Sequence, residues 1–249
     1  MKLETLQEDW EDLSRFDACW AILAYSGEKF GRWDLDAFLE TGIAEIDAVL
    51  TRADQLGLPK RNDRVLDFGC GVGRVLRPFA RRFGEYVGVD ISKNMIRVAR
   101  EIHSEYPNCR FVVNSEDSLR SFPDDHFDLV HTNLVLQHLQ HRSTIESYLA
   151  EFVRVLNNTG LLVFQLPSHL PPLVRLEPRR RLYGVLRRLG VPKRFLYWRL
   201  GLHPSFMRSI PEPEVIAFLG SQRCEVIHVE ESKSPRYGYT SCTYYVRHR

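Results

Sequence analysis

Three glycines alternate with other residues directly after a short apolar run, in the stretch RVLDFGCGVGR at residues 64–74. Glycines at 69, 71 and 73 allow a tight turn and a close approach to a ligand, because no Cβ intrudes. The dinucleotide fingerprint G-x-G-x-x-G would need a glycine at position 74, where this chain has Arg74. The stretch therefore predicts a nucleotide-type ligand, and its spacing disfavours NAD.

Acidic residues stand near this loop, at the ends of predicted strands. Asp67 precedes the glycines, and Asp90 ends the next apolar run, GVDIS. A carboxylate at the second strand end can accept two hydrogen bonds from a ribose diol, whereas Asp67 would repel a pyrophosphate and attract an ammonium group. A third run is followed by NSEDS, whose Glu116, Asp117 and Ser118 could contact an adenine amino group. The set favours a cationic adenosine ligand without phosphate.

Histidines supply the candidates for proton transfer. His138, in LQHLQH, follows the predicted fourth strand, where a neutral imidazole could take a proton from a hydroxyl or amine. A surface or capping histidine is the alternative. His131, inside LVHTN, is expected to be a core histidine with its hydrogen bonds satisfied. His138 and His141 are three residues apart without a third ligand nearby, so no metal site is predicted.

The elements that must position these residues alternate in type. Predicted strands cover 65–68, 86–89, 110–113, 127–132, 161–166, 224–231 and 241–249, and predicted helices cover 35–56, 75–82, 93–106, 143–156 and 211–223, with a turn at 157–160. Such β-α-β-α alternation indicates an α/β fold, a parallel sheet with helices on both faces.

Residues 61–166 resemble, in order and spacing, the class I S-adenosylmethionine-dependent methyltransferases. VLDFGCGVGR is similar to their first motif, GVDIS to the second-strand acid, and NSEDSLRSFPDDHFDLV to the adenine-side loop and the next strand. TNLVLQHL is similar to the segment after the fourth strand. VLNNTGLLVF is similar to the turn and fifth strand, although NNTG departs from the usual Lys-Pro-Gly-Gly. The resemblance implies a Rossmann-like seven-stranded, mostly parallel sheet with an antiparallel last strand, SCTYYVRHR.

The resemblance also implies that S-adenosyl-L-methionine binds at these strand ends and leaves as S-adenosyl-L-homocysteine, without a metal. The implied contacts are Gly69, Gly71 and Gly73 beneath the methionine and ribose, Asp67 at the ammonium, Asp90 at the ribose hydroxyls, Ile91 against adenine, Glu116 or Asp117 with Ser118 at the adenine amino group, and the main chain of Asn133 at the methionine end.

Two segments flank this core. Residues 1–60 are predicted to form a helical lid on a methyltransferase domain at 61–249, in which residues 168–210 form a cap. Aromatic residues of the lid, Trp20, Tyr25 and Trp33, would cover the site or line a substrate pocket. Packing of an extra helix against the core is the alternative interpretation.

The cap is strongly basic. Residues 169–210 contain nine arginines and one lysine against Glu177, a net charge of +9, so the rest of a chain with net charge +2 carries −7. Leu182, Val185, Leu186 and Leu189 form one apolar stripe, and Arg180, Arg181, Arg187 and Arg188 flank it. Three interpretations are open: a cap with solvated arginines, RNA binding, or contact with an anionic or lipid-linked acceptor or a membrane surface through 179–201. In the last, Arg187 and Arg188 would bind substrate.

Bulk properties fit a soluble enzyme. The 249 residues are 44% hydrophobic, which suits one larger domain. Five scattered cysteines without a C-x-x-C pair favour a reducing cytoplasm, and the N-terminal residues lack a signal segment. We therefore expect a cytoplasmic methyltransferase, peripheral to a membrane if the cap binds one, that acts on an O or N atom of a small-molecule, glycan or lipid-linked acceptor. An NAD-dependent oxidoreductase, an RNA methyltransferase and a non-catalytic binder are the alternatives, and the oligomeric state is left open.

Overall fold

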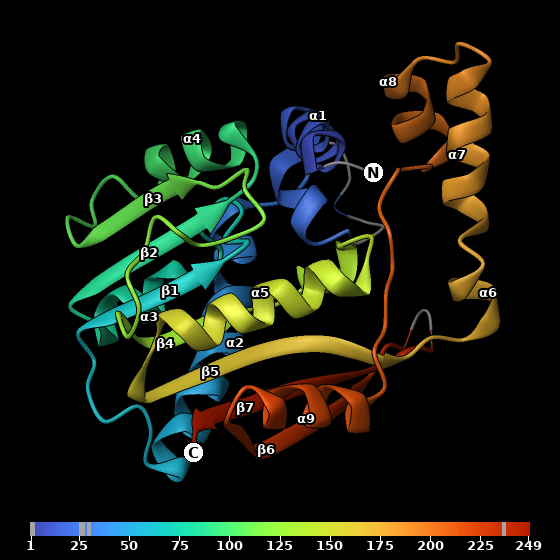
Figure 1. Cartoon of the computed structure of the whole chain (residues 1–249). Helices are drawn as coiled ribbons and strands as arrows, with labels where there is room; N and C mark the ends of the chain where they lie inside the picture. Colours follow the sequence, from blue (N-terminus) through green and yellow to red (C-terminus); the bar gives the residue numbers. More distant parts are fainter. Residues whose placement is uncertain (1–2, 25–27, 29–30, 236–237) are drawn as a thin grey trace.

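Seven strands form one twisted sheet in a computed structural model that describes residues 3–24, 28, 31–235 and 238–249. Their order is β3-β2-β1-β4-β5-β7-β6 (Figure 1). The strands are β1 (Arg64–Phe68), β2 (Glu85–Asp90), β3 (Cys109–Val113), β4 (Phe127–Thr132), β5 (Leu156–His169), β6 (Cys224–Lys233) and β7 (Thr240–His248). The first five run parallel, and β7 is antiparallel to both β5 and β6. The predicted seven-stranded Rossmann-like sheet with an antiparallel last strand is confirmed.

Helices cover both faces of the sheet, as the alternation predicts. One face is covered by α2 (Leu35–Leu56), α3 (Leu76–Arg82) and α4 (Lys93–Ile102), and the other by α5 (Arg142–Val155) and α9 (Glu212–Ser221). Because β1 and β4 contribute apolar side chains to both layers, they are buried on both faces, which is typical of parallel strands. The carboxyl ends of the parallel strands therefore meet at one edge.

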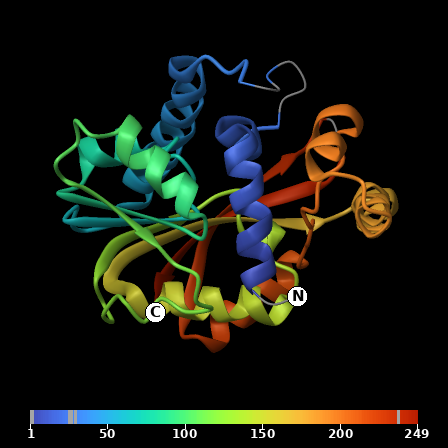
Figure 2. The same ribbon diagram turned by 90° about the horizontal axis from the view of Figure 1, so that it is seen from above.

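The N-terminal helix α1 (Leu3–Ile22) crosses this edge (Figure 2). It contains a kink at Asp17, whose backbone is extended. The Asp17 carboxylate accepts a hydrogen bond from the N–H of Trp20 at 3.0 Å, so it caps the last turn of α1 as an N-cap residue would. The following helix, α2, ends as predicted at Gly57, which adopts a left-handed conformation with φ 66°.

Two boundaries differ from the predictions. The helix predicted to reach residue 106 ends at Ile102, because the buried ring of His103 turns toward the glycine loop and lies 3.2 Å from the carbonyl of Val72. The turn predicted at 157–160 lies inside β5 as a bulge, since Leu156 pairs with Phe127 and Leu161 with Leu129. The side chain of Asn157 accepts a hydrogen bond from the N–H of Thr159, which gives the bulge a local turn.

The cap projects from the carboxyl-end side of β5 (Figures 1 and 2). It consists of α6 (Pro172–Arg175), α7 (Pro178–Arg188), α8 (Lys193–Phe195) and a π-helical turn, η2 (Leu196–Leu200). Leu13 of α1 packs with Tyr183, Leu196 and Tyr197 of the cap in a small hydrophobic cluster. The cap is therefore anchored to α1 and not to the sheet. Among the helices in the described ranges, none combines the length and the apolar character that a membrane crossing requires.

Candidate active site

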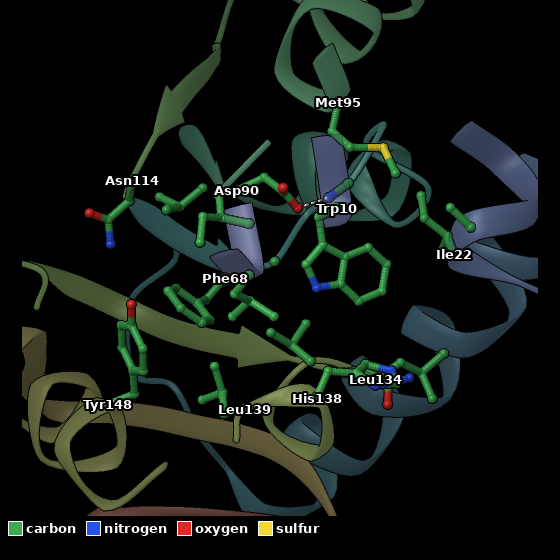
Figure 3. Close-up of a pocket in the computed structure, with 18 residues that line it drawn as sticks. Trp10, Ile22, Phe68, Asp90, Met95, Asn114, Leu134, His138, Leu139 and Tyr148 are labelled. Atoms are coloured by element: carbon green, nitrogen blue, oxygen red, sulfur yellow. Dashed lines mark hydrogen bonds between the residues drawn. The ribbon is translucent and has the colours of Figure 1, made fainter. Parts of the chain in front are cut away.

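A cavity with about 830 Å³ of empty space opens at the carboxyl ends of β1, β2 and β4 (Figure 3). Its walls are mainly apolar and come from the sheet edge, from α1 and from the short 3₁₀ turn η1 (Leu136–His138). Polar side chains enter it at a few points, namely Asp90, Asn114, Asn133, His138 and Tyr148. A large apolar cavity with a few convergent polar groups is the usual form of a small-molecule site.

The glycine loop forms the floor of this cavity. Gly69 has φ 76° and Gly71 has φ 55°, conformations that side-chain-bearing residues rarely adopt. A Cβ on Gly69 would lie 2.2 Å from a methyl group of Val135, and one on Gly71 would lie 2.5 Å from Ile22. Both positions thus need glycine, as predicted. Gly73 has φ 79° but faces His103 and lies outside the cavity lining, so its role is to shape the loop.

Asp90 reaches the cavity from the end of β2. One carboxylate oxygen accepts the N–H of Gly71 at 2.9 Å and the other accepts the N–H of Ser92 at 2.8 Å. Burial raises the pKa of Asp90 to about 6, although these two N–H donors act to lower it. Both oxygens keep free lone pairs, so the carboxylate can still accept hydroxyl hydrogen bonds. Ile91, the next residue, also lines the cavity.

The loop after β3 contributes a different residue than the sequence predicts. Asn114 lines the cavity, and its side chain braces the loop by donating to the carbonyl of Ser118 and accepting the N–H of Glu116. Glu116 and Asp117 have exposed side chains and, like Ser118, do not line the cavity. The carbonyl of Glu116 instead accepts the hydroxyl of Tyr148 at 2.6 Å. The acids of NSEDS therefore lie outside the cavity, because the loop turns them toward solvent.

Asp67 also lies outside the cavity lining, contrary to the prediction that it meets an ammonium group. Successive side chains of a strand point to opposite faces, and Phe68 of β1 faces the cavity. Asp67 therefore points to the other layer, where it accepts the hydroxyl of Tyr86 at 2.7 Å and lies 2.9 Å from Nδ1 of His131. Asp67 and His131 are buried. The expectation of a satisfied core histidine at 131 agrees with this placement.

Asn133, at the end of β4, lines the cavity as expected and is held from behind. Its side-chain amide donates to Glu45 of α2 at 2.7 Å, and the other oxygen of Glu45 pairs with Arg74 at 2.7 Å. Arg74, which occupies the position that a dinucleotide fingerprint gives to glycine, is buried against α2. It links the glycine loop to the helix that holds Asn133.

His138 lines the cavity from η1, beside the ring of Trp10. Its Nδ1 lies 2.7 Å from the carbonyl oxygen of Phe206, which follows the helices of the cap. A carbonyl can only accept, so Nδ1 carries the proton and the neutral ring keeps a lone pair on Nε2, 3.3 Å from the amide of Gln137. Burial lowers the pKa of His138 below its usual value. The ring is therefore a neutral proton acceptor.

The lid aromatics predicted to line the site are placed elsewhere. Trp33 packs on Phe38 and donates its indole N–H to the carbonyl of Leu23, and Trp20 is buried outside the cavity lining. Tyr25 lies outside the described residues. The lid residue that does line the cavity is Trp10, which sequence patterns did not single out.

Hydrogen bonds fix α1 over the site. The Gln7 side chain donates to the carbonyl of Ile91 at 3.1 Å, and Glu11 accepts the Ser92 hydroxyl at 2.7 Å and the Asn94 N–H at 3.1 Å. Acids and amides in α1 read as an ordinary polar helix face, so these contacts gave no signal in the sequence.

A second unpredicted group stabilises the turn after β4. Leu134 has φ 61°, unusual for a leucine, and its N–H donates to the side chain of Gln165 at 3.1 Å. Gln165 also donates to Ser241. A glutamine inside the apolar run LLVFQLP was the available signal for this buried polar contact.

Arg187 and Arg188, predicted to bind substrate, lie outside the cavity lining. Arg187 donates to the carbonyl of Val191 at 2.7 Å and so closes the end of α7, and Arg188 is exposed. Both are displaced from the cavity because the cap stands on α1 and not over the glycine loop.

Comparisons with known proteins agree with this geometry. Residues 66–164 match a family model described as a methyltransferase domain. An uncharacterized methyltransferase of Bacillus subtilis, YcgJ, is 32% identical over 134 residues, which cover 51% of this chain and 51% of that protein. Demethylmenaquinone methyltransferase of Tropheryma whipplei is 34% identical over 121 residues, covering 49% of this chain and 48% of that enzyme. The chain thus spans about half the length of the curated relatives it matches.

Among solved structures, the magnesium protoporphyrin IX methyltransferase of Synechocystis with bound S-adenosylhomocysteine is similar over 98% of this chain and 99% of that chain. The TM-score is 0.63 and the sequence identity 18%, so this likeness concerns the fold.

Proposed function

The chain belongs to the class I S-adenosylmethionine-dependent methyltransferase family, and from this premise we propose that it methylates an O or N atom of an apolar small-molecule or lipid-linked acceptor. The observation that carries the proposal is the cavity in which Gly69 and Gly71 leave space that any Cβ would fill, opposite the carboxylate of Asp90.

The residues present fit this cofactor better than a dinucleotide. Asp90 offers acceptor lone pairs for a ribose diol, and Asn114 offers an amide near the far wall. Within the described ranges, no lysine or arginine lines the cavity, so a pyrophosphate would lack a cationic partner there. We propose that Gly69, Gly71, Asp90, Ile91 and the main chain of Asn133 hold the cofactor, with Asn114 at the adenine edge instead of Glu116 or Asp117.

When bound, S-adenosylmethionine supplies a methyl group already activated by its sulfonium. The protein then needs to position the acceptor, exclude water and receive a proton. His138 is placed for the last task, since its proton sits on Nδ1 and its Nε2 is free to accept. Trp10 and Leu6 of α1 close the cavity against water.

The cavity walls favour an apolar acceptor. Leu6, Ile22, Leu134 and Leu139 give it an aliphatic lining with few hydrogen-bond partners for a glycan. The Tropheryma whipplei relative is named for demethylmenaquinone, a lipid quinone, which supports the same class of acceptor.

Isothermal titration calorimetry with S-adenosylhomocysteine tests the proposal. The wild-type chain should bind, and Asp90→Ala should weaken binding at least about 30-fold, because a carboxylate that accepts two hydroxyls is lost. Glu40→Ala, at an exposed glutamate of α2, is the matched control and should bind like the wild type. Binding of NADH without binding of S-adenosylhomocysteine would refute the assignment.

A further inference from the structure

The cap exposes an unusual number of large apolar side chains. Leu189 is 74% exposed and Leu173 is 71% exposed. Residues of this kind are usually spread singly over a protein surface. Here eight lie within residues 173–200: Leu173, Leu176, Leu182, Val185, Leu189, Phe195, Trp198 and Leu200.

Helix α7 shows that these side chains share a direction. Leu182, Val185 and Leu189 follow each other at i, i+3 and i+7 and so form one stripe. Tyr183, on the other side of the helix, is buried in the cluster with Leu13 of α1. The stripe that the sequence suggested for packing therefore faces away from the protein.

Arginines surround the exposed stripe, and they fall into two groups. Arg180 pairs with Glu177 and lies over the ring of Phe206 at 3.6 Å, Arg208 pairs with Glu177, and Arg187 closes α7, so these three serve the internal structure of the cap. Six others are exposed and form no ion pair with any residue in the described ranges: Arg175, Arg179, Arg181, Arg188, Arg194 and Arg199.

No carboxylate balances these six charges on the cap itself. Within residues 169–210, all of which the structure describes, the only acid is Glu177, which is half-buried and already paired twice. The outer face of the cap therefore presents apolar side chains and cations together, without anions. We call it the cap face, and define it by the eight apolar residues and six arginines just named.

We propose that the cap face docks onto the surface of an anionic lipid bilayer. Such a surface attracts clustered arginines through its negative potential, and its interfacial region accepts aliphatic and aromatic side chains. Neither half of the cap face would suffice in water, since the apolar residues lose contact with a partner and the arginines with counter-charges. Both are satisfied at once at a charged lipid interface.

Other partners fit the cap face less well. Two copies joined through it would bring six arginines of one against six of the other, which is repulsive. RNA would use the arginines but would leave the exposed leucines 173 and 189 without a favourable environment.

Docking would deliver the site to its acceptor. Tyr183 and Leu186 of α7 pack in one cluster with Trp10 of α1, and Trp10 lines the cavity. The cap face is thus on the outside of the same elements that close the cavity. It follows, on the basis of the proposed function, that the acceptor is a lipid-phase molecule that enters beside α1 without crossing water.

Co-sedimentation of the full chain with vesicles tests docking. The wild type should pellet with phosphatidylcholine vesicles that contain phosphatidylglycerol and stay soluble with phosphatidylcholine alone. Arg181→Glu with Arg199→Glu should lower partitioning at least about 25-fold, since each arginine near an anionic surface contributes about fivefold. Leu173→Ser with Leu189→Ser should lower it at least about tenfold.

Matched controls separate the cap face from general effects. Lys60→Glu with Arg81→Glu makes the same change in charge at exposed positions outside the cap, and Ile216→Ser removes an apolar side chain of 40% exposure from α9. Both variants should pellet like the wild type. Calorimetry with S-adenosylhomocysteine should give wild-type affinity for all cap variants, so a failure of docking is distinguishable from a failure of the proposed cofactor.

Three outcomes would overturn docking. One is pelleting that does not depend on phosphatidylglycerol or on the two cap pairs. A second is a wild-type dimer, in analytical ultracentrifugation, that Leu173→Ser with Leu189→Ser dissociates while vesicles retain nothing. The third is retention of poly(U) RNA, lost in Arg181→Glu with Arg199→Glu, without vesicle retention.

Discussion

Asp90 keeps a raised pKa although two backbone N–H groups bind its carboxylate, because its removal from water outweighs them. In the chain without ligand, the folded state thus binds its proton more tightly than the unfolded state does. Stability from this residue therefore falls as the pH rises from about 4 toward about 6, the range between its usual pKa and the raised one. Ligand binding should respond to pH with the opposite sign.

The first prediction concerns this opposite slope. Since only the ionised carboxylate accepts two hydroxyl hydrogen bonds, affinity for S-adenosylhomocysteine should fall about tenfold between pH 7 and pH 5. Calorimetry at several pH values measures it. Asp90→Asn, which cannot ionise, should bind weakly with no such slope. An equal slope in both proteins would assign the titration to another group, such as His138.

The second prediction concerns the proton of His138. Because Nδ1 donates to the carbonyl of Phe206 and burial lowers the pKa, the ring should be neutral and protonated on Nδ1 at pH 7. Long-range ¹H–¹⁵N correlation spectra distinguish the two tautomers, and His138→Gln identifies the resonances. A proton on Nε2, or a pKa above 6.5, would remove His138 as the proton acceptor.

At this scale the sequence indicates residues at strand ends and misses those that depend on direction or on packing. Gly69, Gly71 and Asp90 were predicted correctly to face the cavity, because the ends of parallel strands meet at one edge. Asp67 was predicted wrongly because the alternation of side chains along β1 was not applied to it. Trp10 could not be found, because helix periodicity does not say where a helix docks.

Among the elements, α2 supports the site from behind the sheet. A Cβ on its Gly42 would lie 2.1 Å from the carbonyl oxygen of Arg74, so helix and glycine loop are in direct contact. Glu45, one turn further, connects Arg74 to Asn133. The helix predicted as part of a lid over the site is thus a support beneath it, and α1 alone covers the cavity.

The third prediction tests this support. Glu45→Ala leaves Arg74 nearly buried without a carboxylate, and should lower the free energy of unfolding by about 2–3 kcal/mol. Adding Arg74→Met should restore part of the loss, since the uncompensated charge is gone. Urea denaturation measures both, with Glu40→Ala as the control on the same helix. A double variant less stable than Glu45→Ala would show that the ion pair is not what matters.

Element boundaries could be predicted where a single physical signal sets them. The strand predicted at 127–132 is β4 itself, because a run buried on both faces ends at a polar residue. The end of α4 was misplaced because a buried contact of His103, remote in sequence, stops the helix. The exposed stripe of α7 was assigned to packing for a similar reason: periodicity shows that a stripe exists, and its environment is decided by the rest of the fold.

Over the whole molecule, charge is divided between two parts. The cap carries +9 and the remainder −7, and the exposed arginines of the cap lie beside its exposed leucines. A negatively charged body and a cationic, apolar cap would orient the chain on an anionic surface. Orientation places α1 and the cavity toward the source of an apolar acceptor. The division of charge was visible in the sequence, whereas the outward direction of the leucines required the structure.

The account depends most on one claim, that the cavity between the glycine loop and α1 holds an adenosine cofactor. A crystal structure of the chain grown with S-adenosylhomocysteine tests it directly. The account predicts density for the compound above Gly69 and Gly71, with both ribose hydroxyls within hydrogen-bond distance of Asp90. Density at another place on the molecule, or a ribose facing away from Asp90, would contradict it.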